Sequence, residues 1–195
     1  HQYPYTTLKR IGLCSGNGDI SDYPLDNSYG IYCNYSYSAA PSDVGDAEYV
    51  QMIMVRESVY GADTDGDPEY LSNAQAAAIA NPGALWIIGN EPECPYGQGA
   101  RTPEDYAEIY HRCYTLIKEA DPTARVAVGG VVEPTPLRLE WLDQVLAYYE
   151  LTYGVSMPVD VWTIHIQILD EYAYGAGAGI PVGIDAIEGK RIQWT

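Results

Sequence analysis

A short apolar run that ends abruptly in polar residues constrains the fold of this chain more than any other feature. Residues 84–88 read Ala-Leu-Trp-Ile-Ile, and Gly89 then leads into Asn90, Glu91 and Pro92. An apolar run this short and without alternation is typical of a strand buried on both faces of a parallel sheet, and it is too short for a helix. Because proline lacks the backbone N–H that a ladder needs, the strand must end before Pro92.

Glu91 is therefore predicted to stand at the carboxyl end of a parallel strand. Folds of the α/β class place their reacting groups on this rim, which is formed by the strand-to-helix loops. The alternative is a solvated turn without chemical function, and three residues alone do not separate the two interpretations. Asn90 and Glu91 are the first candidates for function.

Strands and helices are predicted to alternate along the chain, which favours a parallel sheet. The predicted strands cover residues 9–14, 30–35, 49–55, 84–88, 125–131 and 159–166. Helices are predicted over 68–80, from Thr102 onward and over 137–149. In the second of these, Thr102 is the N-cap, Pro103 the first helical residue and Tyr106 the first of an apolar i, i+3, i+4, i+7 stripe.

The length of 195 residues indicates one domain, with a core large enough to be stable without disulfides or a structural metal. Residues 172–195 form a tail of uncertain structure, rich in Gly and Ala at its start and without a strong period. The chain begins at His1 rather than Met, which favours a processed chain or a fragment.

The charge balance narrows the class of partner. With 27 acidic and 10 basic residues the net charge is −17, and nucleic acids and anionic membrane surfaces both require a basic footprint. No stretch reaches the roughly 20 apolar residues of a membrane span, and no signal peptide is recognisable. We expect a neutral ligand, no cofactor, and an extracellular or cell-surface location.

Cysteine and tyrosine usage adds little to the functional argument. The four cysteines, Cys14, Cys33, Cys94 and Cys113, lack CxxC spacing, which argues against zinc and leaves any disulfide pairing undetermined. Cys113 is expected to pack on the apolar face of its helix. Because the chain has 19 Tyr and no Phe, no function is assigned to any single tyrosine hydroxyl.

The run from Trp86 to Pro92 resembles the acid/base motif of clan A retaining glycoside hydrolases, which are (β/α)8 barrels. The position of Asn-Glu-Pro on the fourth predicted strand, and of Thr163-Ile164-His165 on the sixth, agrees with that layout. The resemblance implies a TIM-type barrel in which Glu91 protonates the glycosidic oxygen and later activates water. It also implies that Asn90 binds the sugar 2-hydroxyl.

A retaining hydrolase needs a second carboxylate roughly 5–5.5 Å from the first. In the family this nucleophile is a Glu at the end of the seventh strand, and six predicted strands lead us to expect that the chain ends before that strand. We therefore expect an incomplete barrel of about six strands, with open edges that need a covering partner or residues beyond this sequence. Inside the chain, Glu133 is the best second carboxylate, although we do not favour it.

Other residues are candidates for substrate binding. His165 and Gln167 share a strand face by two-residue alternation, although His165 could equally be a satisfied buried histidine. Arg56 ends the third predicted strand and could orient the acid/base or simply pair with Glu57. Tyr96 lies in the loop after Glu91, which could shape a subsite or merely connect two elements.

The run from Asp63 to Glu69 places carboxylates at alternating positions, as calcium loops do. Asp63, Asp65 and Asp67 would be the ligands, but proline occupies the sixth position, where a sharp turn requires glycine. An acidic surface loop in which Asp67 caps the following helix is the alternative, and it is favoured.

Two functional hypotheses follow from the sequence. The first is a carbohydrate-active enzyme of the retaining glycoside hydrolase type with Glu91 as acid/base. The second is a non-catalytic carbohydrate-binding or structural subunit of an extracellular assembly, derived from the same barrel and self-associating through its open edges. A deep rim pocket with a second carboxylate near Glu91 would favour the enzyme.

Overall fold

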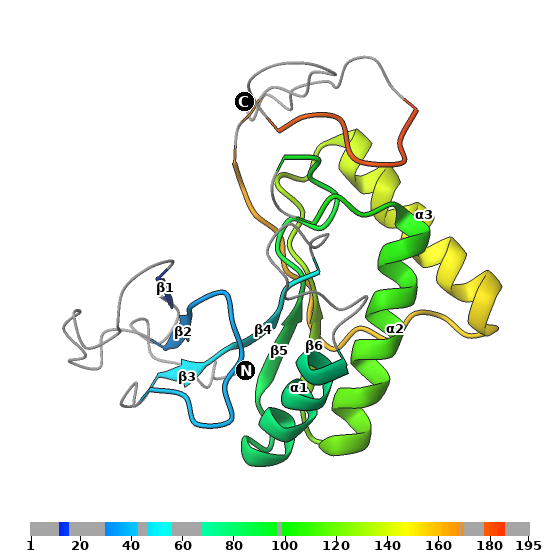
Figure 1. The fold of residues 1–195 in the computed structure, drawn as a ribbon. Helices are drawn as coiled ribbons and strands as arrows, with labels where there is room; N and C mark the ends of the chain where they lie inside the picture. The colour runs from blue at the N-terminus through cyan, green and yellow to red at the C-terminus, as the bar shows by residue number, and fades with distance from the viewer. Residues whose placement is uncertain are drawn as a thin grey trace, which may run out of the picture.

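Short parallel strands and three helices make up the described part of the chain, which covers residues 12–15, 30–42, 47–55, 68–96, 99–167, 169 and 178–185 of a computed structural model (Figure 1). The strands are β1 (Gly12–Cys14), β2 (Ile31–Cys33), β3 (Glu48–Tyr49), β4 (Gln51–Ile53), β5 (Leu85–Ile88) and β6 (Arg125–Val128). The helices are α1 (Pro68–Ala80), α2 (Pro103–Ala120) and α3 (Pro136–Tyr153).

All strand pairs are parallel and join neighbours in chain order, as β1-β2-β3 and β4-β5-β6. The predicted strand 49–55 is divided at Val50, and this corrects the prediction of one continuous strand. Its first part pairs with β2 and its second with β5, on the other side. The division arises because the segment changes partners at Val50, whose N–H still donates to Tyr32 O at 2.7 Å.

The sixth predicted strand, 159–166, forms two isolated parallel bridges rather than a ladder. Val161 pairs with Ala127 and Ile164 with Val131, which places the segment beside β6. Within the described residues nothing pairs with its far side, so the sheet stays open there. This agrees with an incomplete barrel. Trp162, which lies on this segment, is 55% exposed because no described element covers its side of the segment.

The helices begin and end for identifiable reasons. Thr102 caps α2 by accepting a hydrogen bond from Asp105 N–H at 3.2 Å, as predicted. Helix α3 continues past the predicted end to Tyr153, where Gly154 adopts φ +71 and stops it. No helix in the described part of the chain is long and apolar enough to cross a bilayer.

The main core lies between the helices and the sheet β4-β5-β6, whose one face they cover in Figure 1. Trp86 and Ile88 of β5 are fully buried, as are Tyr106 of α2 and Trp141 of α3. The Tyr106 hydroxyl donates to Ile88 O at 2.7 Å and accepts from Gly129 N at 2.8 Å, so this buried ring needs its hydroxyl. Packing of β5 against α2 fixes where the strand ends and hence where Glu91 lies.

Candidate functional site at the carboxyl end of β5

The backbone holds Glu91 in a defined and unusual conformation directly after β5. Its φ is +47, in the left-handed region that non-glycine residues adopt mainly at functional or tightly constrained positions. The Glu91 N–H donates to Gly130 O at 3.0 Å, and its carbonyl accepts from Cys94 N at 3.0 Å and Gly99 N at 3.2 Å. These three hydrogen bonds compensate for the strained φ and fix the direction of the side chain.

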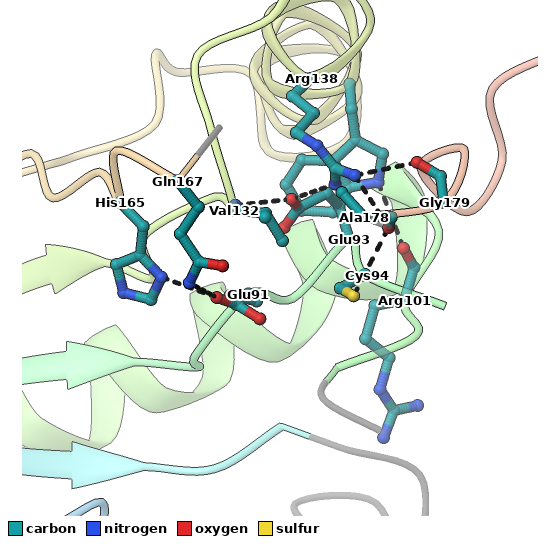
Figure 2. A network of polar contacts seen from close by, with 11 residues as sticks. Glu91, Glu93, Cys94, Arg101, Val132, Arg138, His165, Gln167, Ala178 and Gly179 are labelled. Atoms are coloured by element: carbon teal, nitrogen blue, oxygen red, sulfur yellow. Dashed lines mark hydrogen bonds and ion pairs between the residues drawn. The ribbon is translucent and has the colours of Figure 1, made fainter. Parts of the chain in front are cut away.

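Two side chains from the extended segment after α3 converge on the Glu91 carboxylate (Figure 2). His165 Nδ1 lies 2.9 Å from Glu91 Oε1, and Gln167 Nε2 donates to the same oxygen at 3.0 Å. Alternation along an extended segment puts residues 165 and 167 on one face, which explains why both reach Glu91. The structure thus brings together three of the residues selected from the sequence.

The hydrogen bond to Glu91 raises the pKa of His165 above its ordinary value, although partial burial opposes this shift. A protonated His165 forms an ion pair with Glu91, whereas the neutral ring can still donate one hydrogen bond. Both recorded partners of the carboxylate bind Oε1. The side chain of Glu91 is 11% exposed, so its contact with solvent is small but present.

The other predicted site residues fall into different environments. Asn90 is buried beside Glu91, at 6% exposure. Tyr96 is 48% exposed, and its ring lies close to Gly179. Arg56 lies outside the described residues, as do Asp63, Asp65 and Asp67 of the calcium candidate.

A buried ion pair missed by the sequence analysis lies next to Glu91. Glu93 and Arg138 are both fully buried, and their side chains form an ion pair and hydrogen bond (Figure 2). Glu93 Oε1 also accepts from Val132 N at 2.9 Å, and Arg138 donates to the carbonyls of Ala178 and Gly179. Burial raises the pKa of the Glu93 carboxyl, while the Arg138 charge opposes that shift. Only the fold brings residues 93 and 138 together, so no local sequence signal could have identified them.

Glu133, the candidate second carboxylate, is buried and accepts a hydrogen bond from the backbone. It is 4% exposed and its Oε2 accepts from Leu169 N at 3.2 Å. In the described part of the chain, the recorded side-chain partners of Glu91 are His165 and Gln167, and neither is a carboxylate.

A second group missed by the sequence analysis lies at the carboxyl ends of β1 and β2. A hydrogen bond with Cys14 raises the pKa of Tyr35 to about 12, and the charge of Glu91 is among the weaker causes. Tyr35, with φ +57, therefore lies within electrostatic range of the site. The signal in the sequence was a cysteine within each of the first two predicted strands.

Two further observations concern metal binding and the pocket expected near Glu91. Among the described residues no group of three or more His, Cys, Asp or Glu side chains is arranged to bind a metal ion. A hollow of about 420 Å³ lined by Glu48, Gln51, Asn81 and neighbouring residues lies at the amino ends of the strands, opposite to Glu91. It is therefore not the pocket expected around the acid/base.

Together these features define a class of fold: an α/β protein with parallel strands of TIM-barrel type, open in its described part, and a carboxylate just beyond the end of β5. No family model and no curated protein matches the sequence. The fold is similar to the crystal structure of a GH128 (subgroup II) endo-β-1,3-glucanase from Sorangium cellulosum, with a TM-score of 0.55 and 19% identity. The match covers 80% of this chain but 59% of the glucanase chain.

Proposed function

We propose that this chain is a carbohydrate-active protein whose reacting group is Glu91, acting as the general acid/base of a retaining glycoside hydrolase. The observation that carries the proposal is the position of Glu91 directly after β5, with its carboxylate bound by His165 and Gln167. The likeness of the fold to that of a β-1,3-glucanase supports the same assignment. By analogy with the printed activity of that neighbour we propose a substrate of the β-glucan class. We also propose a location outside the cell, as expected from the sequence.

The arrangement suits proton transfer at a glycosidic oxygen. Both hydrogen bonds on Glu91 use Oε1, so Oε2 is the oxygen that would carry the proton to the leaving group. In the second step the same oxygen would take a proton from the attacking water. Asn90, the preceding residue, would bind the sugar 2-hydroxyl.

Retention also requires a nucleophile roughly 5–5.5 Å from the acid/base. Neither Glu93 nor Glu133 is suited to this role, because both are buried and bind protein groups. We propose that the nucleophile comes from outside the described residues.

The test compares hydrolysis by three proteins on aryl β-glucosides and β-1,3-gluco-oligosaccharides. Wild type should cleave with retention of anomeric configuration, which NMR of the products measures. Glu91→Gln should lose at least about 10²-fold in kcat/KM. Glu119→Gln is the matched control, since Glu119 is exposed on α2. Equal activity of Glu91→Gln and wild type would refute the acid/base role.

The second candidate function, a non-catalytic binding or structural subunit, is favoured by one specific observation. The outermost extended segment exposes Trp162, Ile164 and Ile166, at 55%, 50% and 69%, beside an edge that no described segment covers. Such an edge favours pairing with another chain. This function predicts oligosaccharide binding without hydrolysis, measured by calorimetry, and self-association that Ile166→Lys abolishes in light scattering.

A further inference from the structure

Two cysteines are register partners on neighbouring parallel strands. Cys14 ends β1, Cys33 ends β2, and the two residues are paired directly across the sheet. The pairing continues one residue further, where Ser15 N donates to Cys33 O at 2.9 Å. Adjacent strands lie about 4.7–4.9 Å apart, which is inside the Cα separation of roughly 4.4–6.8 Å that a disulfide spans. Both side chains extend from the same face of the sheet because they are in register.

The two thiols have complementary properties for thiol–disulfide exchange. A hydrogen bond from Cys33 lowers the pKa of Cys14 to about 6, and the same bond together with burial raises the pKa of Cys33. Cys14 is exposed, whereas Cys33 is buried. At neutral pH the accessible member is therefore a thiolate and can attack, and the buried member is a thiol positioned to resolve.

The other two cysteines are both buried and neither is a register partner of another cysteine in the described strand pairs. Cys113 is fully buried in the core face of α2. Cys94 is buried with its pKa raised by burial, and its Sγ lies 3.7 Å from Ala178 O. Neither is accessible to a soluble disulfide, so they serve as internal controls.

We propose that Cys14 and Cys33 are a redox pair that low-molecular-weight disulfides, such as glutathione disulfide, convert into a disulfide joining β1 to β2. The Cys14 thiolate attacks one sulfur of glutathione disulfide, whose S–S bond breaks and releases one glutathione thiolate. Cys33 then loses its proton to solvent and attacks the Cys14 sulfur, and the second glutathione leaves as a thiolate. Two protein thiols are oxidised, and one disulfide is reduced to two thiols.

The pair lies within electrostatic range of the candidate site. The Cys14 charge is among the causes that raise the pKa of His165, which in turn binds Glu91. Oxidation removes this negative charge, so we expect the pKa of His165 to fall when the disulfide forms. A cross-link between β1 and β2 also restricts the unfolded chain, and we expect Tm to rise by roughly 6–12 °C.

The experiment equilibrates the full chain in glutathione buffers of varied redox ratio, blocks the remaining thiols with iodoacetamide, and measures intact and peptide masses. Wild type should lose two alkylation sites together and yield a Cys14–Cys33 cross-linked peptide. Cys33→Ser should stop at a Cys14–glutathione adduct, and Cys14→Ser should give no adduct on Cys33. The double control Cys94→Ser/Cys113→Ser should behave as wild type.

The rate of alkylation of Cys14 gives an independent readout that does not depend on disulfide formation. In Cys94→Ser/Cys113→Ser this rate should rise through an inflection at a pH of about 6, and adding Cys33→Ala, which removes the hydrogen-bond donor, should move that inflection toward the ordinary value of about 8.5. Persistent glutathione adducts in wild type, alkylation of Cys14 at every redox ratio, or an unshifted inflection would each overturn the proposal.

Discussion

Glu91 and Glu93 are two residues apart in the same loop, yet the fold gives them opposite environments. The Glu91 side chain reaches the rim, where His165 and Gln167 bind it and some of it remains exposed. The Glu93 side chain is fully buried and binds Arg138 and the backbone of Val132. Glu91 keeps one carboxylate oxygen available for a ligand, whereas Glu93 binds protein groups that stabilise the loop.

At this rim, a carboxylate with a proposed chemical role and a carboxylate that stabilises the fold lie only two residues apart. Arg138 donates to Glu93 and also to the carbonyls of Ala178 and Gly179, so a single guanidinium joins α3, the loop after β5 and the segment 178–185. That network fixes the loop that carries Glu91 with its positive φ. The buried ion pair thus supports the loop that carries Glu91.

The largest loss of stability is expected from Glu93→Gln. Breaking a buried ion pair leaves the Arg138 charge uncompensated, which should lower the free energy of unfolding by about 3–5 kcal/mol in urea denaturation. Replacing both partners, as Glu93→Leu/Arg138→Met, should recover most of the loss. A single variant within about 1 kcal/mol of wild type would show that the pair is not structural.

A smaller effect is expected from Arg138→Lys, which keeps the charge but loses the planar fork. Lysine cannot bind Glu93 and both carbonyls with the same geometry, so the loss should be about 1.5–3 kcal/mol. Limited proteolysis should then cut within residues 178–185 faster than in wild type. Arg112→Lys, on the exposed face of α2, provides the control, and equal cutting rates in all three proteins would contradict the role of Arg138 in fixing that segment.

Glu91→Gln should change the free energy of unfolding by less than about 1 kcal/mol in the same urea assay, because its pairing is partly exposed and the amide retains an acceptor oxygen. The kcat/KM of Glu91→Gln, in contrast, should fall at least about 10²-fold. A stability loss equal to that of Glu93→Gln would remove the distinction between the two carboxylates.

The smallest expected effect is the pH dependence of stability that arises from His165. Because the folded pKa of His165 is raised, its contribution to stability is complete below its unfolded value of about 6.5 and is lost as the pH rises through the folded value. The stability difference between wild type and His165→Gln should therefore be largest at mildly acidic pH and decline above neutrality. NMR titration should show the His165 pKa falling in Glu91→Gln, and an unchanged pKa would disprove the coupling.

Local patterns were sufficient for the helices and for the position of the buried strand. Pro68, Thr102 with Pro103, and the apolar stripe from Tyr106 define helix starts and faces through interactions among near neighbours. The continuous apolar run before Asn90 likewise predicted β5 and the end of the strand. Backbone sterics and periodicity act over a few residues, so the sequence alone determined these elements.

Only the tertiary structure decided what meets Glu91. Sequence alternation placed His165 and Gln167 on one face, but their contact with a residue more than seventy positions earlier depends on the bridges that bring 161 and 164 beside β6. The same holds for Glu93 with Arg138 and for Cys14 with Cys33, whose pairings come from packing and register. Contacts between distant segments depend on the whole arrangement of the sheet, and no short stretch of sequence contains that information.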